Sequence, residues 1–214
     1  MAYRHVDELA QEWRGRRREI NRRLEEFRQI GRGTEEQLFA ELAFCIFAIQ
    51  TSAHRSDEAV RGLATSGLLW RGSAREVAAF LRRRVRFHNH KGAYLVAARE
   101  RFSGGDGPLR AWVHEIPPPS ARERFVREID GFGYKEASHF LRNVGRGEEF
   151  AILDRHILKN LRYHGVIRSV PDSLSRTRYL AIEEKARAFA EDVDIPLAGM
   201  DLLFWSHETG AVFK

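Results

Sequence analysis

The segment Ile129-Asp-Gly-Phe-Gly-Tyr-Lys135 decides the fold, because it joins two helical patterns through a turn with two glycines. Gly131 and Gly133 permit backbone angles that other residues resist, so they predict a tight hairpin. The hairpin leads directly into a helix N-terminus, where unpaired backbone N–H groups favour phosphate. This pattern is typical of a helix-hairpin-helix unit, which holds the DNA backbone without reading bases. The alternative is an ordinary connection between two helices that contains two glycines.

On both sides of the hairpin the sequence has helical periodicity and no convincing strand alternation, so we expect an all-α fold. The run from Leu38 to Ile49 is apolar on all sides, which predicts a central, buried helix. Pro117-Pro-Pro119 is expected to be a stiff spacer. Further helices are expected at about 5–29, 91–102, 135–145, 155–164, 176–192 and 197–208. Capping boxes predict three more helix starts, at Thr34 with Gln37, Ser73 with Glu76, and Ser120 with Glu123.

The composition excludes several classes of protein. The chain has 214 residues, 43% of them hydrophobic, so it can bury a core in one large domain or two small lobes. The longest apolar run, Leu42–Ile49, is far shorter than the ~20 residues of a membrane helix, and the polar start predicts no secretory signal. Cys45 is the one cysteine, which excludes an internal disulfide framework and Cys-ligated zinc or iron–sulfur sites.

The basic residues are mostly arginine. The net charge is +6, and 31 of the 36 basic residues are arginines, which indicates a phosphate-rich partner such as nucleic acid. A high-GC genome is an alternative explanation of the bias. The clusters at 16–18, 22–23 and 82–86 can also be solvated helix faces.

Lys135 adds a feature that a DNA-binding module does not require. Arginine stays protonated and cannot act as an amine nucleophile, whereas a neutral lysine can. The helix N-terminus disfavours an ammonium charge, which favours the neutral amine. The alternative is a chance lysine that contacts phosphate.

Asp154 follows Lys135 by 19 positions and stands at the expected start of the next helix. One interpretation is an N-cap, which is a common role for Asp at this place. The other is a carboxylate that faces the same cleft as Lys135. Such a carboxylate would stabilise the positive charge that develops on a sugar as its base departs. The two roles are compatible.

The strings Gly131–Gly145 and Leu153–Ile157 resemble the archaeal-type 8-oxoguanine DNA glycosylase/AP lyases of the helix-hairpin-helix superfamily. The chain length, the apolar helix and the ending Phe213-Lys214 extend the resemblance over the whole chain. It implies a two-lobed helix-hairpin-helix DNA glycosylase fold with the active site in the cleft between the lobes. We expect one lobe from 1–33 and 154–214, and the other from 34–153, ending in the helix-hairpin-helix unit at about 120–145.

The resemblance also implies an activity: excision of 8-oxoguanine and β-elimination through a lysine Schiff base, in base excision repair. It makes Lys135 the nucleophile and Asp154 the catalytic aspartate, while Gly131 and Gly133 hold the DNA backbone. The expected partner is double-stranded DNA with 8-oxoguanine or abasic sites, bound by a monomer. No cofactor, metal or membrane partner is expected, and the expected location is cytoplasmic and nucleoid-associated.

Recognition of the base is expected to involve Phe87, Trp205, Phe213 and Lys214, because aromatic faces can hold a flipped base. The resemblance points to the C-terminal lysine and its carboxylate as the group that detects the N7–H of 8-oxoguanine. Phe87 and Trp205 can equally be core residues. The histidines have no convincing metal spacing and are interpreted as solvated or structural: His88, His90, His139 and His156.

Two alternatives stay open. One is a glycosylase of the same superfamily for a different lesion, or one without lyase activity, although Lys135 argues against a purely monofunctional enzyme. The other is a non-catalytic helix-hairpin-helix DNA-binding protein, which would tolerate Arg at position 135 and any N-cap residue at position 154.

Overall fold

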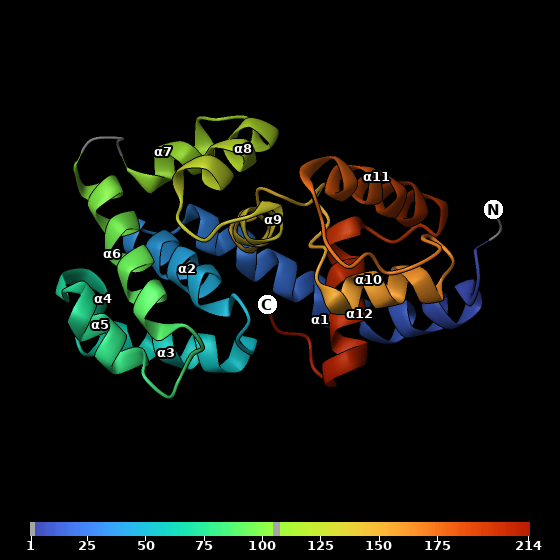
Figure 1. The fold of residues 1–214 in the computed structure, drawn as a ribbon. Coiled ribbons are helices and arrows are strands. Elements are labelled where there is room, and N and C mark those ends of the chain that lie inside the picture. The colour runs from blue at the N-terminus through green and yellow to red at the C-terminus, as the bar shows by residue number, and fades with distance from the viewer. Residues whose placement is uncertain (1–2, 105–107) are drawn as a thin grey trace.

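The computed structural model describes residues 3–104 and 108–214, and every regular element in these two ranges is a helix (Figure 1). The expected all-α class is therefore confirmed. The helices are α1 (Val6–Arg32), α2 (Glu35–Ala48), α3 (Ala53–Thr65), α4 (Leu68–Arg71), α5 (Ala74–Leu81), α6 (His88–Gly104), α7 (Leu109–His114), α8 (Pro118–Glu128), α9 (Tyr134–Asn143), α10 (Arg155–Tyr163), α11 (Arg176–Asp192) and α12 (Leu197–Thr209). Within the described ranges, no helix is long and apolar enough to cross a membrane.

Two of the three expected capping boxes are present. Thr34 Oγ1 accepts from the backbone N–H of Gln37, and the Gln37 side chain accepts from the N–H of Thr34 at 2.7 Å. Ser73 and Glu76 form the same reciprocal pair at the start of α5. Side chains at these positions satisfy backbone donors that a helix leaves free at its first turn.

The prediction of a third capping box at Ser120 is wrong, and so is the prediction that Pro117–Pro119 form a spacer. Helix α8 begins at Pro118, two residues before Ser120, because proline is well suited to a first helical turn, where its missing N–H costs nothing. Glu123 therefore does not cap a helix. Its carboxylate instead accepts hydrogen bonds from the Tyr134 hydroxyl at 2.6 Å and from Arg176 Nη2 at 2.9 Å.

The core consists of two hydrophobic clusters. The first is built around α2, which packs against α3, α6, α7 and α9 and is buried on all sides, as its apolar run predicts. The second joins α1 to α10, α11 and α12, so the two ends of the chain share one cluster. Figure 1 shows the first cluster's helices to the left, the second's to the right, and α9 between them.

Helix α9 is held against α1 by a close backbone approach. A Cβ atom at Gly31 would collide with the carbonyl oxygen of Val144, directly after α9. Only glycine permits this contact. The contact fixes the helix that carries Lys135 at the seam between the two clusters.

Candidate active site

The hairpin between α8 and α9 has the geometry that its glycines predict. Gly131 has φ 82°, a left-handed conformation, and a Cβ there would lie 2.8 Å from the Tyr94 ring. The N–H of Phe132 donates to Ile129 O at 3.1 Å, which closes the turn, and both side chains are buried. Gly133 is the N-cap of α9, and its N–H donates to Glu136 Oε2 at 3.1 Å. The buried side chains of Ile129 and Phe132 therefore anchor the hairpin, and its glycine backbone leads directly into the first turn of α9.

Lys135 is the second residue of α9, and a quarter of its side chain is exposed. Its Nζ lies 3.6 Å from Glu136 Oε1, which is longer than a hydrogen bond. The amine is therefore accessible and only loosely paired, as a nucleophile requires.

Asp154 is the N-cap of α10, so the N-cap interpretation is confirmed. Its Oδ1 atom accepts from the backbone N–H groups of His156 and Ile157, each at 2.8 Å. Because both bonds use Oδ1, capping does not occupy Oδ2. The side chain can serve as a cap and still present an oxygen to a substrate.

Asp201 of α12 links these two residues. The pKa of this buried carboxyl is raised to about 6 by burial, against the lowering effect of Arg142, while Asp154 raises it and Lys135 lowers it. Arg142 Nη2 lies 3.2 Å from Asp201 Oδ2. The charges of Lys135 and Asp154 therefore both act on the buried Asp201 carboxyl. Sequence reasoning missed Asp201, although a lone Asp inside the apolar run 198–204 was a signal.

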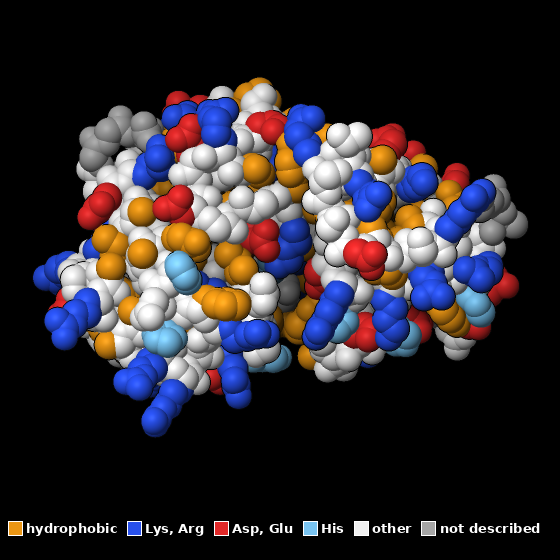
Figure 2. All heavy atoms as spheres, in the orientation of Figure 1, with side chains coloured by type: hydrophobic (Ala, Val, Ile, Leu, Met, Phe, Trp, Pro, Cys, Tyr) orange, Lys and Arg blue, Asp and Glu red, His pale blue; other side chains and the backbone are white. Residues whose placement is uncertain are grey.

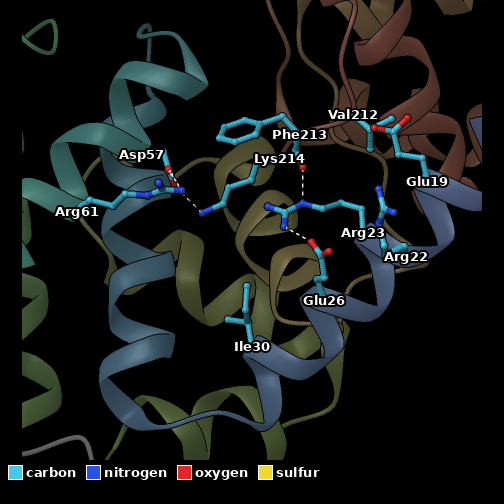
Figure 3. Close-up of a pocket in the computed structure, with 10 residues that line it drawn as sticks. All are labelled: Glu19, Arg22, Arg23, Glu26, Ile30, Asp57, Arg61, Val212, Phe213 and Lys214. Atoms are coloured by element: carbon cyan, nitrogen blue, oxygen red, sulfur yellow. Dashed lines mark hydrogen bonds and ion pairs between the residues drawn. The ribbon is translucent and has the colours of Figure 1, made fainter.

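The tail residues Phe213 and Lys214 pack inward (Figure 3). Arg23 Nε donates to Phe213 O at 2.7 Å, and the Phe213 ring stacks on His54 at 4.4 Å. Lys214 Nζ donates to Glu41 Oε2 and Asp57 Oδ1, each at 3.0 Å.

The Lys214 amine also lies 4.4 Å from the centre of the Phe44 ring. Burial alone would lower the pKa of Lys214, but the two carboxylates raise it above its ordinary value. The amine is therefore fixed as a cation. A cavity of about 340 Å³ adjoins it between α1, α3 and the tail.

Trp205 and Phe87 have different surroundings. Trp205 is partly buried, and its ring lies 6.3 Å from Phe213 and 6.5 Å from His54, so the structure brings it to the tail. Phe87 is 49% exposed, has φ 56°, and lies under the Arg86 guanidinium. It is neither a core residue nor part of the aromatic group at the tail.

Two further buried polar residues feel the charge of Lys135: His139, which the sequence left as either solvated or structural, and Lys91, to which it assigned no role. His139 is buried in α9, packs edge-on against Phe44, and neither ring nitrogen has a hydrogen-bond partner. Burial, then the charges of Lys135, Arg142 and Lys214, lower its pKa well below the ordinary value, so the ring is neutral. Of the two interpretations offered by the sequence, His139 is therefore a structural residue and not a solvated one.

Lys91 is the second of these residues. Its Nζ donates to Phe47 O at 2.7 Å, Ile49 O at 2.6 Å and Thr51 Oγ1 at 2.9 Å, holding the end of α2. Burial, then Arg86 and Lys135, lower its pKa to about 8. Nothing local in the sequence predicts these partners, because they lie about 40 residues away.

Basic side chains are numerous on the face of the molecule that Figure 2 draws. Figure 2 shows Lys and Arg along the lower part of this face, on both sides of a central hollow. Next to Lys91 lies a groove of about 580 Å³, lined by four arginines and the loop after α2. These arginines are Arg55, Arg83, Arg84 and Arg86. Within the described part of the chain, no cluster of three His, Cys, Asp or Glu residues is placed to hold a metal ion.

Comparison with known proteins gives consistent matches. A family model described as 8-oxoguanine DNA glycosylase matches residues 20–195. A Fusobacterium nucleatum protein named 8-oxoguanine DNA glycosylase/AP lyase is 45% identical, over 90% of this chain and 89% of its own. A Methanocaldococcus jannaschii protein of the same name is 38% identical, over 91% of each chain.

Solved structures agree with these matches. The 8-oxoguanine DNA glycosylase of Thermotoga maritima is similar with a TM-score of 0.86 at 35% identity, over 98% of this chain and all of that one. The M. jannaschii 8-oxoguanine glycosylase/lyase in complex with a 15mer DNA containing 8-oxoguanine has a TM-score of 0.86 at 33% identity. That match covers 96% of this chain and 99% of the other.

Proposed function

Because this chain belongs to the 8-oxoguanine DNA glycosylase family, we propose that it excises 8-oxoguanine from double-stranded DNA and cleaves the strand at the abasic site. The fold is the helix-hairpin-helix DNA glycosylase fold. One observation supports the lyase chemistry most directly. Lys135 is accessible and loosely paired in the first turn after the hairpin, and its charge and that of Asp154 both act on the buried Asp201 carboxyl.

In this proposal Lys135 is the nucleophile. Its neutral amine attacks C1′ of the flipped nucleotide, and the base leaves with the electron pair of the glycosidic bond. The nitrogen then loses a proton, and its lone pair breaks the C1′–O4′ bond. O4′ takes up a proton as the sugar ring opens, which gives a protonated Schiff base. Loss of a C2′ proton then drives β-elimination, which breaks the C3′–O bond and releases the 3′ strand with a 5′-phosphate.

Asp154 stabilises the positive charge that develops on the sugar as the base departs. Oδ1 remains bound to the first turn of α10, so the carboxylate is pre-oriented before DNA binds. The hairpin at Gly131 and Gly133 and the first-turn N–H groups of α9 hold a backbone phosphate.

Base recognition is assigned to the tail and its neighbours. Phe213 and Trp205 offer aromatic faces, and Lys214 is held rigidly by Glu41 and Asp57. Phe87 is proposed to contact bases from the exposed rim instead, because its ring is accessible. These contacts would select 8-oxoguanine by its C8 carbonyl and its N7–H, which guanine lacks.

The two hydrophobic clusters are proposed to be the two lobes that enclose the DNA, with Lys135 and Asp154 at their junction. A single copy of the chain carries both residues, which supports action as a monomer. Its substrate is chromosomal DNA, so we place the protein inside the cell and at the nucleoid.

Borohydride trapping tests this function. The protein is incubated with duplexes that contain 8-oxoguanine, guanine or a pre-formed abasic site, and borohydride reduces any Schiff base to a stable cross-link. We expect a cross-link with 8-oxoguanine and abasic DNA and none with guanine. Cross-linking to abasic DNA alone would contradict the substrate, and cross-linking to none of the duplexes would contradict the lysine chemistry.

A further inference from the structure

The backbone that leads into Asp154 is held from one side by α11. Glu183 Oε1 accepts from the N–H of Ala151 at 2.9 Å. The Tyr179 hydroxyl donates to Ala151 O at 2.6 Å and accepts from the N–H of Leu153 at 3.2 Å. The three residues before Asp154 are therefore fixed by two buried side chains of one helix.

The same glutamate is tied to the hairpin unit. Arg122 of α8 donates to Glu183 through both terminal nitrogens, at 2.7 Å and 3.0 Å. Arg122 Nη1 also donates to Ser138 Oγ at 3.3 Å, on the α9 turn that follows Lys135. The Arg122 guanidinium packs 3.9 Å from the centre of the Phe150 ring. One ion pair thus touches both the helix that carries Lys135 and the segment that carries Asp154.

Stability alone is a poor explanation for this arrangement. Arg122 is 6% exposed and Glu183 is 3% exposed, so both charges lose their hydration on folding. Apolar residues of similar volume commonly match or exceed the stability of such a pair. Arg122 Nε also lacks a partner, which adds a further cost. The bidentate geometry does, however, fix distance and orientation more strictly than apolar packing.

We propose that Arg122, Glu183 and Tyr179 are positioning residues that set the Asp154 carboxylate against the Lys135 amine. We call these three residues the α8–α11 bracket. The proposal rests on the proposed function, because it concerns the geometry of that reaction. A displacement of about 1 Å at a reacting centre can cost about 10²-fold in rate. The bracket acts through Asp154 and touches no substrate.

Three variants test the bracket. Tyr179→Phe removes only the hydroxyl that holds Ala151 and Leu153. Glu183→Gln keeps the shape and removes the charge. The double variant Arg122→Met/Glu183→Leu replaces the pair with apolar volume, so that it can fold even where a single unpaired charge would not. The matched control is Glu148→Gln, which breaks an ion pair between α1 and the loop after α9, where Arg28 Nε donates to Glu148 at 2.7 Å.

Single-turnover release of 8-oxoguanine, cleavage of a pre-formed abasic site, DNA affinity and melting temperature are measured for each protein. We expect Tyr179→Phe and the double variant to release the base about 10-fold or more slowly, with DNA affinity within about twofold of wild type. Abasic-site cleavage should fall less, because no base departs in that reaction. The control should match the wild type.

A double-mutant cycle with Asp154→Asn separates positioning from a general structural role. If the bracket acts through Asp154, the Asn substitution should slow base release far less in the double variant than in the wild type. Two results would overturn the proposal: wild-type base release by the double variant, or an undiminished effect of Asp154→Asn within it. If the wild-type protein and the Glu148→Gln control are both folded and neither releases 8-oxoguanine, the result would instead contradict the proposed function.

Discussion

Two lysines in this molecule sit in opposite environments. Lys135 at the start of α9 is a quarter exposed and has one carboxylate at 3.6 Å. The Lys214 side chain in the tail is only 12% exposed, with two carboxylates at 3.0 Å and the Phe44 ring below its amine. A tightly paired ammonium is held away from a substrate carbon, whereas a side chain without such partners is free to approach one. The comparison teaches that the surroundings, and not the residue type, decide which lysine we propose as the nucleophile and which one anchors the tail.

The largest expected effect comes from replacing Lys135, the proposed nucleophile. Lys135→Gln should abolish both base release and strand cleavage, by at least about 10³-fold, because the proposed mechanism forms its covalent intermediate on the Lys135 amine. DNA affinity should change little. Borohydride cross-linking, single-turnover rates and affinity are measured together, with Lys159→Gln, an exposed lysine of α10, as the control. Cross-linking of the Lys135 variant at the wild-type rate would remove Lys135 from the mechanism.

The next effect concerns Asp154, the proposed catalytic carboxylate. Asp154→Asn should slow base release by roughly 10²-fold or more, because it removes the charge that we propose stabilises the transition state. Stability should fall by about 1 kcal/mol or less, since Asn is also a good N-cap. Single-turnover kinetics and thermal unfolding are compared. Near-normal base release would leave Asp154 with the capping role only.

Replacing Lys214, which anchors the tail, should reduce the preference for 8-oxoguanine more than it reduces the rate of strand cleavage. Lys214→Met or deletion of Lys214 leaves Glu41 and Asp57 without their shared cation, so the tail should loosen. We expect the preference for 8-oxoguanine over guanine to fall by about 10-fold, within the range that a few lost pocket contacts can produce. Cleavage of an abasic site should change less. Lys214→Arg, which keeps the charge, is the matched variant, and full preference in the Met variant would place base recognition elsewhere.

A third lysine, Lys91, extends the comparison to a buried amine that donates to two backbone carbonyls and a hydroxyl, and the smallest expected effect is on its contribution to stability. Its pKa is about 8 in the folded protein against 10.5 for an unhindered lysine. Between these values the unfolded chain binds more protons, so the free energy of unfolding should rise as pH increases from 8 to about 10. Below pH 8 both states are protonated and the full cost of burying the charge is present.

Urea unfolding at several pH values measures this contribution. The rise should be on the order of 1 kcal/mol for wild type and should be absent from Lys91→Met. Lys185→Met, at an exposed position of α11, is the control. An equal pH dependence in wild type and Lys91→Met would contradict the contribution of Lys91.

Local sequence predicted those features that depend on local physics. Two glycines determine the hairpin, an apolar run determines the burial of α2, and α12 ends at Gly210 with φ 85°, close to the expected helix end at 208. The exception is instructive: at Ser120 a capping pattern competed with two prolines that prefer the same first turn, and the prolines prevailed.

The candidate site was predictable only where its residues lie near the hairpin or serve as a cap. Lys135 meets the first condition and Asp154 the second. Asp201 and the Arg122–Glu183 pair meet neither, because their partners are separated by about 60 residues and meet only after folding. The expected aromatic residues divided for the same reason: Trp205 reaches the tail, while Phe87 stands on a separate exposed turn.

The second hydrophobic cluster has a consequence for synthesis on the ribosome. Leu9, Ile20 and Phe27 of α1 are buried against side chains that begin at Ala151. At 5–20 residues per second, roughly 6–25 s pass between the emergence of α1 and that of its partners. During this interval the first cluster can assemble, while the apolar stripe of α1 stays uncovered. The nascent chain is therefore most open to aggregation at its earliest helix, and holding chaperones would be expected to bind there until the last three helices are made.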